Sequence, residues 1–355
     1  MRNRYGKTLI ASVLLSSLTV VGLESVAVAE PDRNADSVLQ RVNSAAPSTA
    51  PSSDETALTL SPVADTVVGD STENTTAIPS DPANEIELSS TAGGEASLKL
   101  TLPDLNLEDA SVDSGATGAV FASDTVDVSV QAFEEGARIA TTIYSASAPE
   151  TFSYPVSVPA GGDVESTSDG MVVVTDSAGD PVGYFAIPWA RDADGRTLQT
   201  NFLVDGDTVK QTVNHRVAGV SYPVVADPYL GKNLIKSTAW SWIPRNSTGS
   251  IGAGYTLRVT ATDWAWKNSS QGYAGYSYTV GTYGWKELYK KRKNGGLNVN
   301  LDTMRDQFIC HQEYALSYYG KKRPTWNLDE WRKDRSYWWT VRYACNPPAG
   351  GKWRY

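Results

Sequence analysis

Hydrophobic and polar residues alternate in short runs through the middle of the chain, between residues 95 and 228. The run Thr-Val-Asp-Val-Ser-Val-Gln at 125–131 places every second side chain on one face, which is typical of a sheet with one wet face. Turn-forming Gly, Asp and Ser residues separate further runs at 97–102, 137–144, 151–158, 171–175, 181–187, 201–204, 208–213 and 220–225. The pattern predicts an all-β, sandwich-like domain over 95–228, large enough for its own core.

The pattern changes after Asp227-Pro228, a step that indicates a turn or linker. The elements expected beyond it are a strand at 255–261, a strand or hairpin at 272–284, a short helix at 285–292, a helix at 301–319 and a last short helix from about 334 to 344. We therefore expect residues 229–355 to form a small α+β domain.

The start of the chain has the three parts of a secretory signal over residues 1–29. Basic residues are followed by an apolar run and by the small residues Ala27-Val28-Ala29. The apolar run is shorter than the roughly 20 residues that a membrane-spanning helix needs. The mature protein is expected to be secreted, either free or held at the cell surface.

Residues 30–94 are rich in Ser, Thr, Ala, Pro and acidic residues and contain no Trp, Tyr or Phe. A segment of this composition buries too little apolar surface to offset the entropy lost on ordering. We expect a disordered acidic stalk or pro-segment, so the chain is predicted to be multidomain.

Charge is divided unequally between the two halves. Residues 229–355 contain 20 Lys and Arg against 8 Asp and Glu, whereas residues 1–228 contain 11 against 32. Ten of the 11 Trp residues also lie in the basic part. This distribution favours an anionic bacterial surface or a wall glycan as partner, with the acidic leader as an intramolecular partner. Intracellular nucleic acid is not expected as a partner of an exported chain.

The chain has two cysteines, Cys310 and Cys345. In an exported protein an even pair favours a disulfide, and closing a loop of about 35 residues would contribute roughly 3–4 kcal/mol. The alternative is a reactive Cys310 thiol paired with His311. Neighbouring residues on a helix point about 100° apart, which disfavours that pair and favours a disulfide-tied C-terminal domain.

Aromatic and basic residues are the candidate contacts for a ligand or a bacterial envelope. On a strand, each Trp-x-Trp pair would present both rings on one face, suited to sugar stacking or a membrane interface. The aromatic candidates are Trp240, Trp242, Trp264, Trp266, Trp338, Trp339 and Trp353. The basic candidates are Lys290, Lys291, Arg292, Lys293, Lys321, Lys322 and Arg323. The alternatives are that at least half of the C-terminal Trp residues belong to the core and that the basic face is merely solvated.

Three C-terminal motifs resemble a known family. They are Met-Arg-Asp-Gln-Phe-Ile-Cys-His at 304–311, the terminal Cys-Asn-Pro at 345–347, and the motif Trp326, Asn327, Leu328, Asp329, Glu330, Trp331 and Arg332. With them, the end of the chain is similar to secreted actinobacterial proteins that carry a C-terminal domain of unknown function. Asp329 stands where that pattern has Glu, and Trp338-Trp339 replace small residues. The β domain resembles a module that precedes varied C-terminal domains in such proteins, which implies a carrier or pro-domain role.

Catalytic signals are scarce. No spacing of His, Cys and carboxylate residues matches a metal site, and no cofactor-binding motif is present. The favoured function is a secreted precursor, cleaved near Asp227-Pro228, whose released C-terminal domain acts on anionic bacterial envelopes like a bacteriocin. One alternative is a non-catalytic surface module that binds wall polysaccharide. The other is a hydrolase that uses the carboxylate of Asp329 or Glu330, and an enzyme is the less favoured class.

Overall fold

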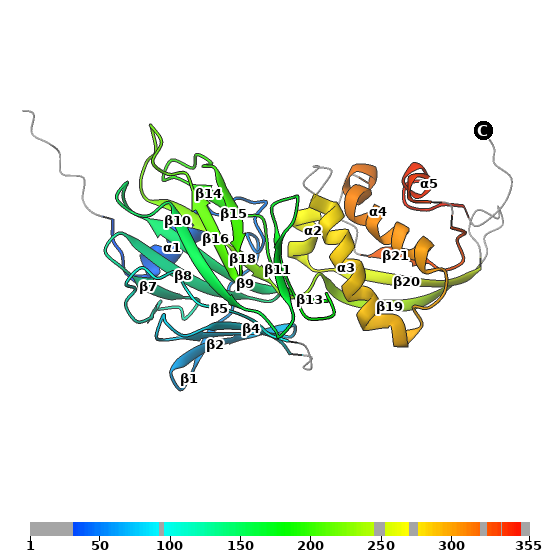
Figure 1. The fold of residues 1–355 in the computed structure, drawn as a ribbon, viewed down its shortest axis with the longest axis horizontal. Helices are drawn as coiled ribbons and strands as arrows, with labels where there is room; N and C mark the ends of the chain where they lie inside the picture. The colour runs from blue at the N-terminus through cyan, green and yellow to red at the C-terminus, as the bar shows by residue number, and fades with distance from the viewer. Residues whose placement is uncertain are drawn as a thin grey trace, which may run out of the picture. The chain divides into compact units, whose positions relative to one another are not determined.

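The computed structural model describes residues 31–91, 96–244, 253–269, 276–319, 325–334 and 336–348. The signal expected at 1–29 lies outside these residues. From Arg33 onward the chain belongs to one compact unit. Within this unit we distinguish two regions by the sheets that they contain: a β module, residues 33–231, and a C-terminal domain, residues 232–348 (Figure 1).

Two antiparallel sheets make up the β module. The first has the strand order β1-β2-β3-β4-β5-β10-β16-β15. Its strands are β1 (Leu60–Val63), β2 (Thr66–Asp70), β3 (Asn74–Pro79), β4 (Ile86–Ser90), β5 (Leu98–Leu100), β10 (Thr151–Ser157), β15 (Thr200–Asp205) and β16 (Thr208–Val213). Strands β1 to β5 pair in sequence order, and β10 connects them to the β15–β16 hairpin.

The second sheet has the order β11-β12-β13-β18-β9-β8-β7-β6, and β17 pairs with both β9 and β14. Its strands are β6 (Ser111–Val112), β7 (Ala119–Ala122), β8 (Val126–Phe133), β9 (Gly136–Ile143), β11 (Asp163–Ser166), β12 (Val172–Thr175), β13 (Pro181–Phe185), β14 (Trp189–Arg191), β17 (Val224–Asp227) and β18 (Tyr229–Gly231). Alternate residues of both sheets, such as Val128, Ile139 and Phe152, are fully buried in one core. The predicted all-β, sandwich-like fold is confirmed.

The segment 31–91 is folded, so the prediction of a disordered stalk is wrong over these residues. Helix α1 (Ala35–Ala45) begins after Asn34, whose side chain accepts a hydrogen bond from the Ser37 amide. Its apolar face packs on the outer side of the second sheet, where Val38 and Val42 are fully buried. Strands β1 to β4 extend the first sheet. Composition was misleading because β1 to β4 pair with one another and with β5, and residues distant in sequence complete the core that their few apolar side chains enter.

A three-stranded sheet, in the order β19 (Ile235–Ile243), β20 (Gly254–Ala261) and β21 (Trp326–Asp329), forms the centre of the C-terminal domain. Its helical segments are α2 (Asp263–Ser269), α3 (Tyr276–Arg292), the 3-10 helix η1 (Lys293–Gly295), α4 (Leu301–Tyr319) and α5 (Tyr337–Arg342). The predicted α+β class and the predicted helix over 301–319 are confirmed. The strand or hairpin predicted at 272–284 is wrong over its described part, because α3 occupies 276–292.

The boundary between the two regions lies later than the sequence indicates. Strands β17 and β18 flank Pro228 and both pair with β9, so the second sheet continues through the expected linker. The C-terminal sheet begins at Ile235. The connection is therefore residues 232–234, and it is buried.

Candidate functional site

The polar residues of the Trp-Asn-Leu-Asp-Glu-Trp-Arg motif hold the C-terminal domain together. Asp329 is buried and accepts hydrogen bonds from the Thr256 hydroxyl and from Arg332 Nε, the latter at 2.6 Å. Its backbone pairs in both directions with the side-chain amide of Gln307 on α4, at 3.0 and 3.2 Å. Arg332 donates onward to the Pro347 carbonyl. The three sequence motifs therefore meet in one buried structural network.

The apolar residues of the same motif form the core of this domain. Trp326 stacks on Trp266 with ring centroids 5.6 Å apart and meets Phe308 edge-on at 5.9 Å. Leu328 is fully buried, whereas Asn327 is exposed. Trp331 is half-buried over Gly254, where an added Cβ would lie 2.6 Å from the indole. These contacts show that the apolar residues of the motif pack the core of the C-terminal domain.

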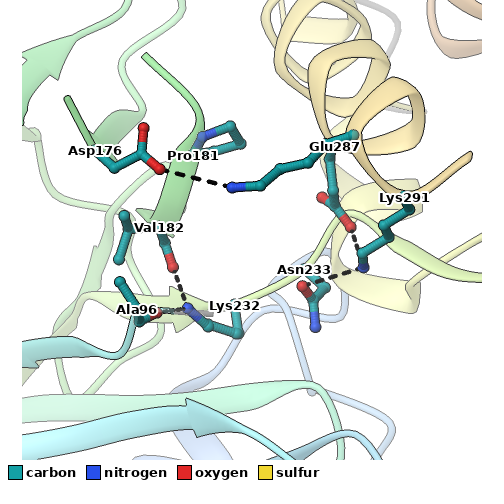
Figure 2. A pocket seen from close by; sticks show the side chains of 9 residues that line it. Ala96, Asp176, Pro181, Val182, Lys232, Asn233, Glu287 and Lys291 are labelled. Atoms are coloured by element: carbon teal, nitrogen blue, oxygen red, sulfur yellow. Dashed lines mark hydrogen bonds and ion pairs between the residues drawn. The ribbon is translucent and has the colours of Figure 1, made fainter. Parts of the chain in front are cut away.

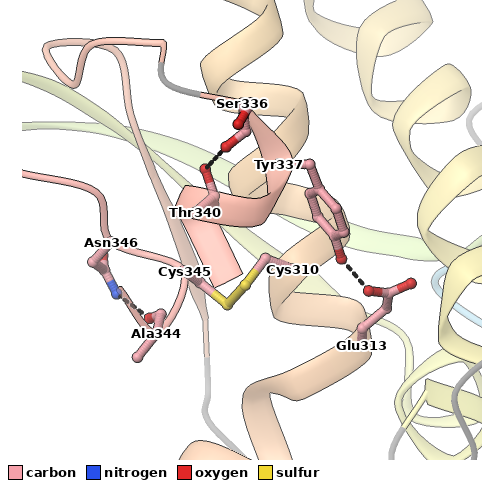
Figure 3. The surroundings of a disulfide bond; sticks show 8 residues. All are labelled: Cys310, Glu313, Ser336, Tyr337, Thr340, Ala344, Cys345 and Asn346. Atoms are coloured by element: carbon pink, nitrogen blue, oxygen red, sulfur yellow. Dashed lines mark hydrogen bonds between the residues drawn. A yellow bond between two sulfur atoms is a disulfide. The ribbon is translucent and has the colours of Figure 1, made fainter. Parts of the chain in front are cut away.

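A disulfide between Cys310 and Cys345 joins α4 to the segment that follows α5, as predicted (Figure 3). Both half-cystines are fully buried. A second tie links the same helices, because the Tyr337 hydroxyl donates to the Glu313 carboxylate. The neighbouring His311 is also buried, and desolvation lowers its pKa to about 4. Because its sulfur is bonded to Cys345, Cys310 has no thiol to act as a nucleophile beside His311.

Trp264 and Trp266 are buried on helix α2, so their assignment as a strand-borne pair of ligand contacts is wrong. Trp264 Nε1 donates to the Asn233 carbonyl at 2.8 Å. Its ring lies against Tyr184 and Tyr229 of the β module, with centroids 5.5 and 6.2 Å away. A Cβ at Gly231 would lie 2.3 Å from this indole, so the glycine makes room for it. Trp264 thus packs the C-terminal domain against the β module.

Trp242 and Tyr255 form an exposed aromatic pair on the three-stranded sheet. They are opposite each other in the β19–β20 register, and their ring centroids are 5.1 Å apart at 76°. Trp242 is 57% exposed and Tyr255 is 50% exposed. Trp240 lies 6.4 Å from Tyr255, and its indole N–H donates to the Gly295 carbonyl at 2.8 Å. We call these three residues the aromatic ledge.

Polar groups border the ledge. Glu330 is half-buried and accepts a hydrogen bond from the Tyr255 backbone N–H at 3.1 Å. The side-chain amide of the exposed Asn300 donates to the Glu330 carbonyl. Sequence reasoning did not identify Tyr255 or Asn300 as site residues. Pairing the expected strand at 255–261 with the Trp-x-Trp strand would have brought Tyr255 to Trp242.

A second exposed aromatic group lies on α5. Trp338 is 59% exposed and meets Trp339 edge-on at 4.5 Å. The Arg342 guanidinium lies 5.4 and 5.3 Å from these two rings, within cation–π range. Trp353 lies outside the described residues.

The basic run at the end of α3 lies at the surface, and most of its side chains form ion pairs or hydrogen bonds within the protein. Lys290 forms ion pairs with Asp176 and Asp180 of the β module. Lys291 bonds Glu287 at 2.8 Å (Figure 2). Arg292 donates to the Thr238 carbonyl at 2.8 Å, and Lys293 is exposed. Lys290 and Lys291 are nevertheless exposed, so the assignment of Lys290, Lys291 and Arg292 as envelope contacts stays a prediction, in which the two lysines would exchange these ion pairs for a ligand. Lys321, Lys322 and Arg323 lie outside the described residues.

The expected processing site, Asp227-Pro228, is inaccessible in this fold. Asp227 is 1% exposed, and its backbone carbonyl accepts a hydrogen bond from the Gln211 side chain at 3.0 Å. Burial raises the pKa of its carboxyl to about 7, partly opposed by the positive charge of Arg138. A protease could cleave here only after the second sheet had opened.

Over the part of the chain that the structure describes, no cluster of His, Cys, Asp and Glu residues is arranged to hold a metal ion. Within the same residues, none of the helices has a stretch long and apolar enough to cross a membrane.

Comparison with known proteins finds a family model similar to the C-terminal region. Residues 235–348 match the model of a protein of unknown function (DUF2599), and this match begins where β19 begins. Among curated proteins, none matches the chain. One solved structure, a mutant of the glycoside hydrolase family 81 enzyme from Clostridium thermocellum, is 12% identical with a TM-score of 0.25. That match covers 58% of this chain and 30% of the hydrolase, so the chain spans less than a third of that structure's length.

Proposed function

We propose that this chain is an exported, non-catalytic binding protein whose C-terminal domain attaches to cell-envelope polysaccharide through the aromatic ledge. The observation that supports it is the contrast between Trp242 and Tyr255, which are open to solvent, and the motif residues, which are used for packing. Exposed apolar side chains that adjoin one another in a patch, unlike single ones, are typical of interaction sites. Export is supported by the signal-like start of the chain and by the disulfide.

A glycan suits the ledge better than a lipid surface. The two rings stand on paired strands, where they are held rigidly and lose little entropy on binding. The apolar C–H face of a sugar ring can pack on one indole while its hydroxyls reach polar groups such as Asn300 and Glu330. Attachment to anionic lipid would instead rely on free cations, and the α3 lysines are paired with carboxylates.

The carboxylates of the motif do not favour hydrolysis. Asp329 is buried and bonded to Arg332, and Glu330 is bonded to the Tyr255 backbone. A glycosidase needs two carboxyl groups that face the scissile bond, one of them able to donate a proton. The site is therefore better suited to holding a sugar than to cleaving it.

A pull-down on insoluble wall polysaccharide tests this function. The full-length mature chain should co-sediment with it, and Trp242→Ala should lose most of that binding. Trp338→Ala is the matched control, since it removes an indole of equal exposure from α5. Equal loss from both variants, or from neither, would argue against the ledge.

A masked precursor is the second candidate, and one observation favours it. Acidic residues of the β module pair with basic residues of the C-terminal domain: Asp180 with Lys290 at 3.1 Å, Glu135 with Lys236 at 3.2 Å, and Asp54 with Lys267. Under this function, mass spectrometry of culture supernatant should find a fragment that starts near residue 232, and that fragment should inhibit bacterial growth. Full-length mature chain alone in the supernatant would exclude it.

A further inference from the structure

A polar cavity of about 340 Å³ lies on the outer side of the second sheet of the β module. The C-terminal end of α1 and the segment 52–57 form one side of it, and strands β8 and β9 form the other. Its volume is within the range of small-molecule sites. The cavity is remote in sequence from the aromatic ledge and contains none of its residues.

Three side chains in the cavity wall, Glu55, Gln131 and Arg138, have buried hydrogen-bonding atoms with no partner within the described ranges. Gln131 of β8 is 1% exposed, and among the described residues neither the nitrogen nor the oxygen of its carboxamide has a partner. Arg138 of β9 is 2% exposed and donates through its terminal nitrogens to Asn43, Pro51 and Ser52, whereas its Nε has no partner in that same set. Buried polar groups are nearly always satisfied, so each unpaired group calls for an explanation.

The charged side chains around the cavity favour an uncharged ligand over a cation or an anion. The Arg138 guanidinium disfavours a cation. Glu55 in the wall, with Glu135 nearby, disfavours an anion. Burial and the charge of Glu135 raise the pKa of Glu55 to about 7, so near neutral pH its carboxyl can both donate and accept. A ligand with adjacent donors and acceptors, such as the hydroxyls and amide of a sugar, complements this set.

We propose that this cavity is a binding site for a neutral ligand of the size of one sugar ring, held by Gln131 and Arg138. The terminal torsion of a glutamine is soft, so the carboxamide can turn toward the ligand without leaving its rotamer well. The site does not depend on the proposed function of the C-terminal domain, because it lies entirely within the β module.

The test titrates the full-length chain with N-acetylglucosamine and with glucose at millimolar concentration. Nitrogen–proton NMR follows the Gln131 side-chain amide and Arg138 Nε–H. We expect saturable shifts of both signals with at least one sugar. In Gln131→Met the Arg138 shift should require about tenfold more sugar, while the thermal midpoint stays unchanged or rises, because an unsatisfied amide has been removed.

Gln211→Met is the matched control. Gln211 is also fully buried in the β module, but its amide donates to Thr200 and Asp227. This variant should lower the thermal midpoint and keep the sugar-dependent shifts. Absence of any shift at Gln131 and Arg138 with either sugar would mean that the cavity holds only water and would overturn the proposal. Shifts confined to the indole signals of the ledge would likewise overturn it, while leaving the proposed function standing.

Discussion

Arg332 Nε lies 2.6 Å from the Asp329 carboxylate, and the two residues are only 7% and 5% exposed. Removing the carboxylate would leave a buried guanidinium without its partner, which typically costs about 3–5 kcal/mol. We expect Asp329→Ala to lower the free energy of unfolding by that order in denaturant melts. Glu330→Ala, which removes one acceptor of a single backbone hydrogen bond, should cost about 1 kcal/mol. Similar losses from both variants would contradict the structural role of the motif.

Trp264 is expected to couple the unfolding of the two regions. Trp264→Ala removes a fully buried indole and should cost about 3–5 kcal/mol. Because this ring contacts Tyr184 and Tyr229, its loss should also split a single calorimetric transition into two. Trp242→Ala, an exposed site, should leave the melting curve nearly unchanged. A single transition of unaltered midpoint in Trp264→Ala would show that the regions are not held by this contact.

Asp227 is expected to contribute a component of the unfolding free energy that falls as the pH rises. Its pKa is raised from 3.8 to about 7, so the folded state favours the protonated carboxyl. The loss of unfolding free energy that comes from ionising this buried carboxyl is absent below pH about 4. It grows as the pH rises toward 7 and reaches about 4 kcal/mol at most. Asp227→Asn should abolish this component and be more stable than wild type at pH 8. Parallel pH profiles of the two proteins in chemical denaturation would refute the assignment.

His311 gives a dependence of the opposite sign. Its pKa is lowered from 6.5 to about 4, so the folded state favours the neutral ring. The stability associated with it is present above pH 6.5 and is lost as the pH falls toward 4. We expect His311→Gln to remove this pH dependence of the unfolding free energy between pH 4 and 6.5. The dependence due to Asp227 should remain. A profile that changes only above pH 6.5 would contradict this.

The Cys310–Cys345 disulfide closes a loop of sequence separation 35. Loss of such a cross-link should destabilise the C-terminal domain by roughly 3–4 kcal/mol through the entropy of its unfolded state. The double variant Cys310→Ala, Cys345→Ala should therefore melt earlier than wild type, and a reducing agent should affect only wild type. Equal melting of both proteins without reducing agent would contradict the prediction.

Patterns that depend on neighbours in sequence predicted much of this fold. Alternation and turn residues located some strands of the sandwich, such as β8, β9 and β16, helical spacing located α4, and two cysteines in a chain with a signal-like start predicted the disulfide. Contacts between distant residues were beyond such patterns. The segment 31–91 folds because its apolar side chains enter cores that it shares with later strands, and Trp264 is buried because Gly231 makes room for it. Tyr255 was overlooked for the same reason, since only the strand register places it beside Trp242.

The dissociation constant for soluble wall polysaccharide, measured by isothermal titration calorimetry, tests the central claim most directly. The full-length protein should bind, and the combined substitution Trp242→Ala, Tyr255→Ala should weaken binding by at least about tenfold, or 1.4 kcal/mol, with an unchanged melting temperature. Binding of equal strength by the two proteins, or no binding by the wild type, would contradict it.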